Sequence, residues 1–166
     1  PTASSTIKTT TAAVTRNADD LSYDTANWFA DGQAGTIQVD ADLVYTPDAT
    51  SAYIYSIDAG TSANRNVMYR WGSNVLGGYL IVDNAVDGIW NGSVLLNGNA
   101  ARCDWAFANN DTAGINSGGT LSSDSTATLP TGMTTLRIGR YTWASNYLNG
   151  CLLNIIYYQK RLANSV

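Results

Sequence analysis

The residues in this sequence best suited to binding chemistry are its tryptophans and tyrosines. The chain has 5 Trp and 10 Tyr but only 2 Phe. Trp and Tyr join an apolar ring to a polar group, which suits partly exposed positions. Such rings can stack on the apolar C–H faces of sugars, while Asp, Asn and Arg side chains hydrogen-bond to sugar hydroxyls. We therefore predict non-covalent recognition of carbohydrate by exposed aromatic rings.

Five aromatic side chains are the candidate sugar-binding residues, and they lie in consecutive predicted strands. They are Tyr55, Tyr69, Trp71, Tyr79 and Trp90. Alternate side chains of a strand point to opposite faces, so Tyr69 and Trp71 share one face. The alternative for any single ring is that it packs in the core.

The direction of that face depends on the phase of the strand over residues 66–71. If Asn66, Met68 and Arg70 point inward, Tyr69 and Trp71 line the outer, concave face of a sheet. A slip of one residue would reverse this assignment, because the side-chain period of a strand is two. An inward Arg70 is also unfavourable unless it lies at the strand end.

Three other aromatic residues have less specific roles. Tyr141 and Trp143 lie in the loop before the last hairpin, where they either touch a ligand at the rim or brace the loop. Trp105 alternates with Cys103 and Phe107 and is predicted to be core.

The composition argues against catalysis. The chain has no His, and all 13 of its acidic residues are Asp, so His-based acid–base chemistry and His-ligated zinc are excluded. Paired aspartates can serve glycosidases, but Asp40 and Asp42, on one strand face, are better explained as solvated edge charges. We expect a protein that is not an enzyme.

No cofactor is expected, although calcium stays open. The eligible oxygen ligands are Asp58, Asp83-Asn84 and the run 109–111, and these do not form a spaced ligand motif. Asp and Asn are favoured in turns in any case. The two cysteines, Cys103 and Cys151, are expected to be small buried thiols, with a cross-strand disulfide as the alternative.

The elements that must position these residues are strands. Alternating apolar and polar residues, bounded by turn signals, predict strands over 35–45, 52–58, 66–71, 79–84, 89–96, 102–108, 136–138 and 151–158. A turn and a further strand are expected over 109–119, and Asp87-Gly88 and Asn97-Gly98 are expected to be turns. Ten to twelve short strands predict an all-β antiparallel sandwich, in which two sheets pack their apolar faces together.

Length and charge set further limits. The 166 residues suit one domain, which we place at 14–166, after a Ser/Thr/Ala-rich linker or edge segment at 1–13 from a missing upstream region. The sequence shows no signal peptide and no apolar run long enough to span a membrane. A net charge of −4 without a basic cluster argues against nucleic-acid binding.

Several short motifs resemble one family in their order and spacing. They are T-R-x-A-D at 15–19, G-T-I at 35–37, A-G-T-S-A-N-R at 59–65, L-x-I-G at 136–139, L-N-G at 148–150 and Y-Y-x-x-R-L at 157–162. This pattern resembles concanavalin A-like jelly rolls of the laminin-G type, and above all the domains that close tail, fibre and spike proteins of tailed bacteriophages. The resemblance implies a jelly-roll carbohydrate-binding domain of a virion, which attaches to a cell-surface polysaccharide.

One departure from that family concerns the closing strand. Leu153, Asn154 and Ile156 occupy positions where the phage-type domains commonly carry Arg. Two apolar residues there would leave aliphatic surface in water unless it is covered. Since fibre and spike proteins are usually trimers, we expect a contact with a neighbouring subunit or virion protein.

Two alternatives to carbohydrate binding stay open. The domain could cap, decorate or trimerise a virion protein without a ligand, or it could be an Asp-dependent glycosidase or lyase. Fold resemblance cannot separate these functions, and a secreted protein is the alternative to a virion location.

Overall fold

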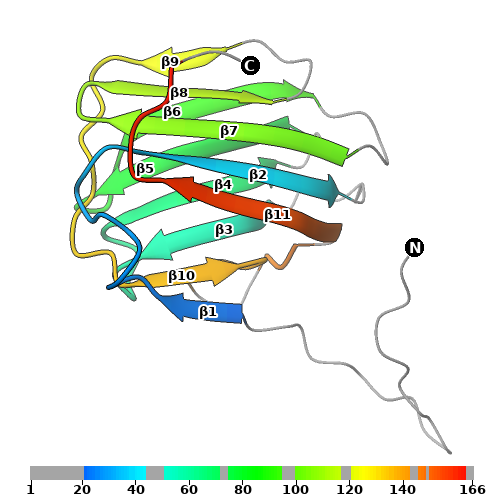
Figure 1. The fold of residues 1–166 in the computed structure, drawn as a ribbon, viewed down its shortest axis with the longest axis horizontal. Coiled ribbons are helices and arrows are strands. Elements are labelled where there is room, and N and C mark those ends of the chain that lie inside the picture. The colour runs from blue at the N-terminus through cyan, green and yellow to red at the C-terminus, as the bar shows by residue number, and fades with distance from the viewer. Residues whose placement is uncertain are drawn as a thin grey trace, which may run out of the picture.

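The computed structural model describes residues 21–43, 51–71, 75–94, 100–116, 121–142, 146–148 and 150–163. These residues form eleven strands and no helix (Figure 1). The strands are β1 (Leu21–Asp24), β2 (Gly35–Leu43), β3 (Ala52–Asp58), β4 (Arg65–Trp71), β5 (Val75–Val82), β6 (Ala85–Val94), β7 (Ala100–Ala108), β8 (Asp111–Asn116), β9 (Ser122–Asp124), β10 (Thr135–Ile138) and β11 (Gly150–Tyr158). Within the described ranges, no helix is long and apolar enough to cross a membrane.

The strands build two antiparallel sheets that face each other. One sheet has six strands in the order β1-β10-β3-β4-β5-β6, and the other has five in the order β11-β2-β7-β8-β9. In Figure 1 the five-stranded sheet lies in front of the six-stranded sheet. Neighbours that are distant in sequence, such as β2 and β11, give the crossed connections of a jelly roll. The predicted all-β sandwich of the concanavalin A-like type is therefore confirmed.

The predicted strand boundaries agree with the structure at most positions, with one clear error. The segment over 52–58 is a strand with the predicted ends, and the short strands β1 and β9 were not predicted. Asp87-Gly88 is not a turn, because β6 runs through it. The chain turns instead at Asp83 and Asn84, whose φ angles of 49° and 70° are conformations that Asp and Asn tolerate. Asn97-Gly98 lies outside the described residues.

The core lies between the sheets and is centred on two tryptophans. Trp90 and Trp105 are both 0% exposed, and their ring centroids are 6.0 Å apart in a stacked arrangement. Trp90 lies against Gly114, where a Cβ atom would come within 2.2 Å of the indole ring. Only glycine at this position lets the two sheets close over the ring. The prediction that Trp105 is core is confirmed.

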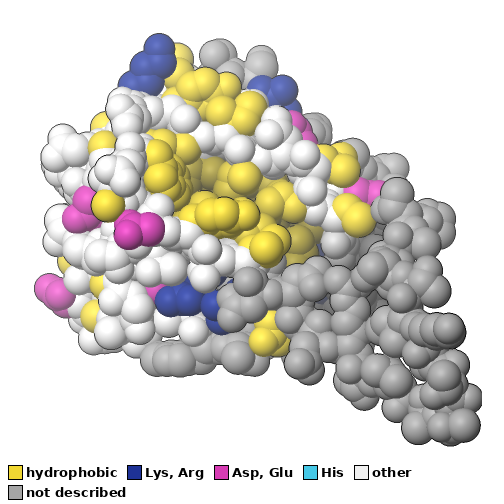
Figure 2. All heavy atoms as spheres, turned by 60° about the horizontal axis from the view of Figure 1, so that its bottom comes forward, with side chains coloured by type: hydrophobic (Ala, Val, Ile, Leu, Met, Phe, Trp, Pro, Cys, Tyr) yellow, Lys and Arg dark blue, Asp and Glu magenta, His cyan; other side chains and the backbone are white. Residues whose placement is uncertain are grey.

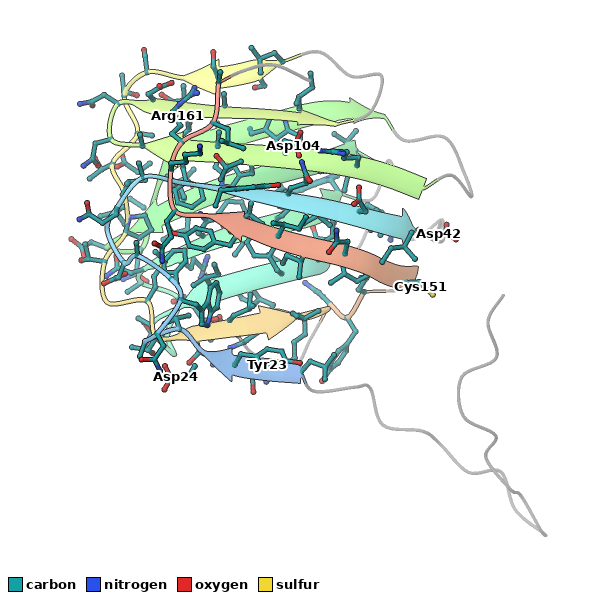
Figure 3. The ribbon with its side chains drawn as sticks, in the orientation of Figure 1. Tyr23, Asp24, Asp42, Asp104, Cys151 and Arg161 are labelled. Atoms are coloured by element: carbon teal, nitrogen blue, oxygen red, sulfur yellow. The ribbon has the colours of Figure 1, made fainter. Side chains whose placement is uncertain are left out.

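The cysteines are not bonded to each other. Cys103 is a buried free thiol in the core, and Cys151 is an exposed free thiol at the start of β11, opposite Asp42 of β2 (Figure 3). The disulfide alternative is therefore wrong, and the expectation of two buried thiols holds only for Cys103. Burial, more than any nearby charge, raises the pKa of the Cys103 thiol far above its usual value.

The sandwich is open on the side where β1 and β10 face β11. A groove of about 550 Å³ reaches between the sheets there, as far as the core residues Ile37 and Ile57. Figure 2 brings this side forward and shows hydrophobic side chains gathered in a hollow. Trp28, Leu136 and Ile155 also line this groove.

Candidate functional site

The phase of β4 decides which aromatic rings can reach solvent. Met68 belongs to the core cluster, and Asn66 bonds to the core residues Tyr55 and Trp105, so this phase of the strand points inward and the prediction is confirmed. Arg70 has the same phase and is 2% exposed. The Asn66 Oδ1 atom accepts hydrogen bonds from the Tyr55 hydroxyl at 3.0 Å and from the Trp105 Nε1 at 3.1 Å. This polar node in the core fixes the register of β4.

Two of the predicted sugar-binding residues are in the core, and this corrects their assignment. Tyr55 is 0% exposed, because a bulge between Tyr53 and Tyr55 places Ile54 and Tyr55 on the same, inner side of β3. Side chains alternate along β6, so Ile89, which is 42% exposed, points outward and Trp90, which is 0% exposed, points into the core. Neither ring can stack on a sugar in this fold.

The other three predicted residues lie together on the outer face of the six-stranded sheet. Tyr69 packs against Tyr79 with ring centroids 5.3 Å apart and against Trp71 with centroids 6.1 Å apart. Tyr69 is only 6% exposed, whereas Trp71 is 56% exposed. Tyr69 therefore supports the cluster, and Trp71 presents its ring to solvent.

Two tyrosines that were not among the predicted site residues complete this cluster. The ring centroid of Tyr53 lies 6.1 Å from that of Tyr69, and the Tyr53 ring stacks on Tyr141 with centroids 4.5 Å apart. Its hydroxyl is 3.0 Å from the Tyr79 hydroxyl. We call these five residues, Tyr53, Tyr69, Trp71, Tyr79 and Tyr141, the aromatic face. In a regular strand Tyr53 and Tyr55 would share one side, and the bulge in β3 separates them.

A hollow of about 370 Å³ lies beside Trp71. Its walls include Tyr69, Ile89 and the amide side chain of Asn91. Its floor needs Gly77, because a Cβ atom there would lie 2.8 Å from the Trp90 carbonyl oxygen and 3.3 Å from the Tyr69 ring. The hollow thus combines an exposed indole, an aliphatic wall and an amide that can donate and accept hydrogen bonds.

An arginine holds the other end of the aromatic face. The Arg65 guanidinium carbon lies 4.8 Å from the centroid of the Tyr141 ring and 5.7 Å from that of Tyr79. A guanidinium between two rings at these distances is stabilised by cation–π attraction. Together with the tyrosine contacts, it fixes the loop that carries Tyr141 over this end of the sheet. Trp143 lies outside the described residues.

The phenols of Tyr69, Tyr79 and Tyr141 stay uncharged near neutral pH. Burial is the main cause that raises the pKa of Tyr69, Tyr79 and Tyr141, and the hydrogen bond with Tyr53 adds to the effect at Tyr79. These groups therefore act near neutral pH as hydrogen-bond donors and acceptors, and not as acids or bases.

Asp58, one of the residues considered for calcium, has a structural role. Asp58 is fully buried, and its Oδ2 atom accepts hydrogen bonds from the Arg137 Nε at 3.0 Å, from the Ser56 hydroxyl at 3.0 Å and from the Thr142 hydroxyl at 3.2 Å. Asn110 takes a positive φ in a tight turn. Over the described part of the chain, no group of three or more His, Cys, Asp or Glu side chains is placed to hold a metal ion.

Solved structures share this fold at low sequence identity. The NanB sialidase of Streptococcus pneumoniae matches with a TM-score of 0.69 and 12% identity, over 87% of this chain and 25% of that one. The Ruminococcus gnavus IT-sialidase CBM40, bound to alpha2,6 sialyllactose, matches with a TM-score of 0.67 and 12% identity, over 90% and 92% of the two chains. Sheep galectin-11, in complex with glycerol, matches with a TM-score of 0.53 and 9% identity, over 87% and 100%.

These likenesses define a class of fold. The chain is a jelly-roll β-sandwich of the kind found in CBM40 and galectin domains, and it spans about a quarter of the sialidase chain that it matches. No protein-family model and no curated protein matches the sequence. The fold alone therefore does not define the particular function.

Proposed function

We propose that this domain binds carbohydrate without cleaving it, through the aromatic face of its six-stranded sheet. The observation that carries the proposal is Trp71, a tryptophan with 56% of its surface exposed, held at a fixed angle by Tyr69 beside a hollow. Trp71 and Ile89, which is 42% exposed, border the same hollow and form one apolar patch, and a contiguous exposed apolar patch marks an interaction site. The neighbour solved with sialyllactose supports the same class of ligand.

Binding without catalysis is proposed on the chemistry of the hollow. Among the described residues that line it, Asn91 is the polar side chain next to Tyr69 and Trp71, and no carboxylate is present. Most glycoside hydrolases use two carboxyl groups across the bond that is cleaved. Asp58 cannot supply one, because it is buried and paired with Arg137.

The biological setting that we propose comes from the sequence motifs. Their resemblance to domains of bacteriophage tail and fibre proteins favours a virion protein that attaches to cell-surface polysaccharide. Repetition of the domain in a homo-oligomer, for which we propose a trimer, would raise weak single-site affinity by avidity.

A purely structural domain is the second candidate, and one observation favours it. Tyr141 is 9% exposed and stacks on Tyr53, so the loop before β11 already covers one end of the sheet face. A capping or trimerisation domain needs no ligand on the part of the face that remains open.

Replacement of Trp71 separates the two candidates. Trp71→Ala should lower affinity for a glycan identified on an array by about ten- to a hundredfold, since a buried aromatic ring contributes about 1.5–3 kcal/mol. Its melting temperature should change little, because the ring is mostly exposed. Tyr23→Ala is the matched control, since Tyr23 is 52% exposed on β1 and outside the aromatic face. If Trp71→Ala and Tyr23→Ala bind the glycan with equal affinity, the aromatic face is not the binding site.

A further inference from the structure

A second cavity lies on the opposite side of the molecule, on the outer face of the five-stranded sheet. Its volume is about 400 Å³, within the range typical of small-molecule sites. The strand register aligns Ala106 of β7 with Thr36 of β2 on one side and Ala113 of β8 on the other. Ala106 and Ala113 are 7% and 3% exposed although they point away from the core, so the side chains around them form walls above this floor.

One wall of the cavity is polar. The Gln38 Nε2 atom donates a 2.8 Å hydrogen bond to the Asp104 Oδ1 atom, and the Arg102 Nε atom is 3.8 Å from the same oxygen. Gln38 is 8% exposed, and the Asp104 side chain is 21% exposed. Both contacts use Oδ1, so the Oδ2 atom of Asp104 can accept hydrogen bonds from a ligand.

The C-terminal tail forms a further wall, and it is held in place by specific bonds. The Thr36 hydroxyl donates to the Lys160 carbonyl oxygen at 3.0 Å and accepts from the Leu162 amide at 2.9 Å. Arg161 forms an ion pair with Asp111 at 2.6 Å. Figure 3 labels Asp104 on β7 and Arg161 on the tail that crosses the upper strands of this sheet. Leu162 thus closes a cavity whose shape is fixed before a ligand arrives.

The chemistry of the walls defines the ligand. Ala113 and Ile115 offer an apolar floor, and the Tyr158 ring borders it, which suits the C–H face of a pyranose. The Asp104 carboxylate only accepts hydrogen bonds, so it selects ligands that carry hydroxyl donors. Arg102 is paired with Asp104 on the same wall, so among its described residues the wall has no unpaired cation to balance the carboxylate of an acidic sugar and favours an uncharged one.

We propose that this cavity is a second carbohydrate site, which binds one neutral pyranose residue between Asp104 and the floor of Ala106 and Ala113. This inference rests on the proposed function, because a domain with sugar sites on both outer faces engages two parts of a polysaccharide. The two sites share no residue, so each can be removed without the other.

The test is a two-dimensional ¹H–¹⁵N NMR titration with the methyl glycosides of glucose, galactose and mannose, and with methyl glucuronide as the acidic probe. At least one neutral glycoside should shift the side-chain amide of Gln38 and the backbone amides of Ala106 and Ala113 in a saturable way. Methyl glucuronide should bind more weakly. Asp104→Asn should weaken binding of the neutral glycoside at this cavity by about tenfold, because it replaces charge-assisted hydrogen bonds with neutral ones.

Controls distinguish this site from the aromatic face. Trp71→Ala should leave the shifts of Gln38 and Ala113 unchanged, and Ala106→Leu, which fills the cavity from its outer side, should abolish them. Shifts confined to the surroundings of Trp71 would overturn the second site and keep the proposed function. Shifts confined to the cavity would keep the second site and overturn the aromatic face. Unchanged affinity in Asp104→Asn, or no saturable shift with any neutral glycoside, would overturn the second site.

Discussion

Trp71 and Trp90 show how the place of a residue in its strand decides its role. Both are tryptophans of the six-stranded sheet, yet one is 56% exposed and the other 0% exposed. Trp71 has the outward phase of β4, whereas Trp90 has the inward phase of β6 and lies in the space that Gly114 leaves. Residue type alone therefore identified a pool of candidates, and strand phase selected among them.

Buried tyrosines should make the folded protein less stable at alkaline pH. Burial is the main cause that raises the pKa of Tyr55, Tyr69 and Tyr79 above the ordinary value. Above about pH 10 the unfolded chain releases phenolic protons that the folded chain retains. The folded state then binds more protons than the unfolded state, so the free energy of unfolding falls as the pH rises further.

We therefore expect a lower melting temperature at about pH 11 than at neutral pH. The phenolate absorbance of Tyr55, Tyr69 and Tyr79 should appear late, together with the loss of structure seen by circular dichroism. Tyr79→Phe should reduce the slope of stability against pH in the alkaline range. Titration of all tyrosines near pH 10 in a protein that is still folded would contradict this account.

At the scale of elements, the sequence predicted what depends on alternation. The strand over 52–58 and the inward phase of Asn66 and Met68 follow from a period of two, and both are confirmed. A bulge is one extra residue without its own sequence signal here, so the inward turn of Tyr55 could not be predicted. The contact of Tyr141 with Tyr53 is equally hidden, because loop conformation does not follow from periodicity.

A largely buried ion pair connects the side chains of β3 and β10. The Arg137 Nε atom lies 3.0 Å from the Asp58 Oδ2 atom, with 16% and 0% of the two side chains exposed. The Asp58 Oδ1 atom also accepts a 2.8 Å hydrogen bond from the Gly60 amide. One carboxylate thus connects two strands and the turn that follows β3.

Asp58→Ala should destabilise the protein by about 3–5 kcal/mol, because it leaves the Arg137 guanidinium largely buried without its partner. The double variant Asp58→Ala/Arg137→Met should lose less, since it removes the unpaired charge as well. Chemical denaturation of the two variants and the wild type provides the comparison. A double variant less stable than Asp58→Ala would show that the pair does not control this junction.

At the scale of the whole molecule, one edge of the five-stranded sheet is open to association. β11 is an edge of the five-stranded sheet, and its nine residues carry neither a charge nor a proline. Leu153 is 62% exposed on it, and Ile155 borders the open groove between the sheets. Proteins usually protect such an edge with charge, proline or a covering partner. A second copy of the chain is the partner that we propose for it.

Leu153→Lys should therefore shift the protein from a homo-oligomer to its 17.7 kDa monomer, because lysine on an edge strand opposes strand-to-strand association. Light scattering coupled to size-exclusion chromatography measures the change. Val86→Lys is the matched control, since Val86 is 60% exposed on β6, an edge of the other sheet. The edge is not an interface if the wild type is already a monomer, or if both variants respond alike. Dissociation by Leu153→Lys alone would place the subunit contact at β11 and leave the aromatic face of each subunit free for a glycan.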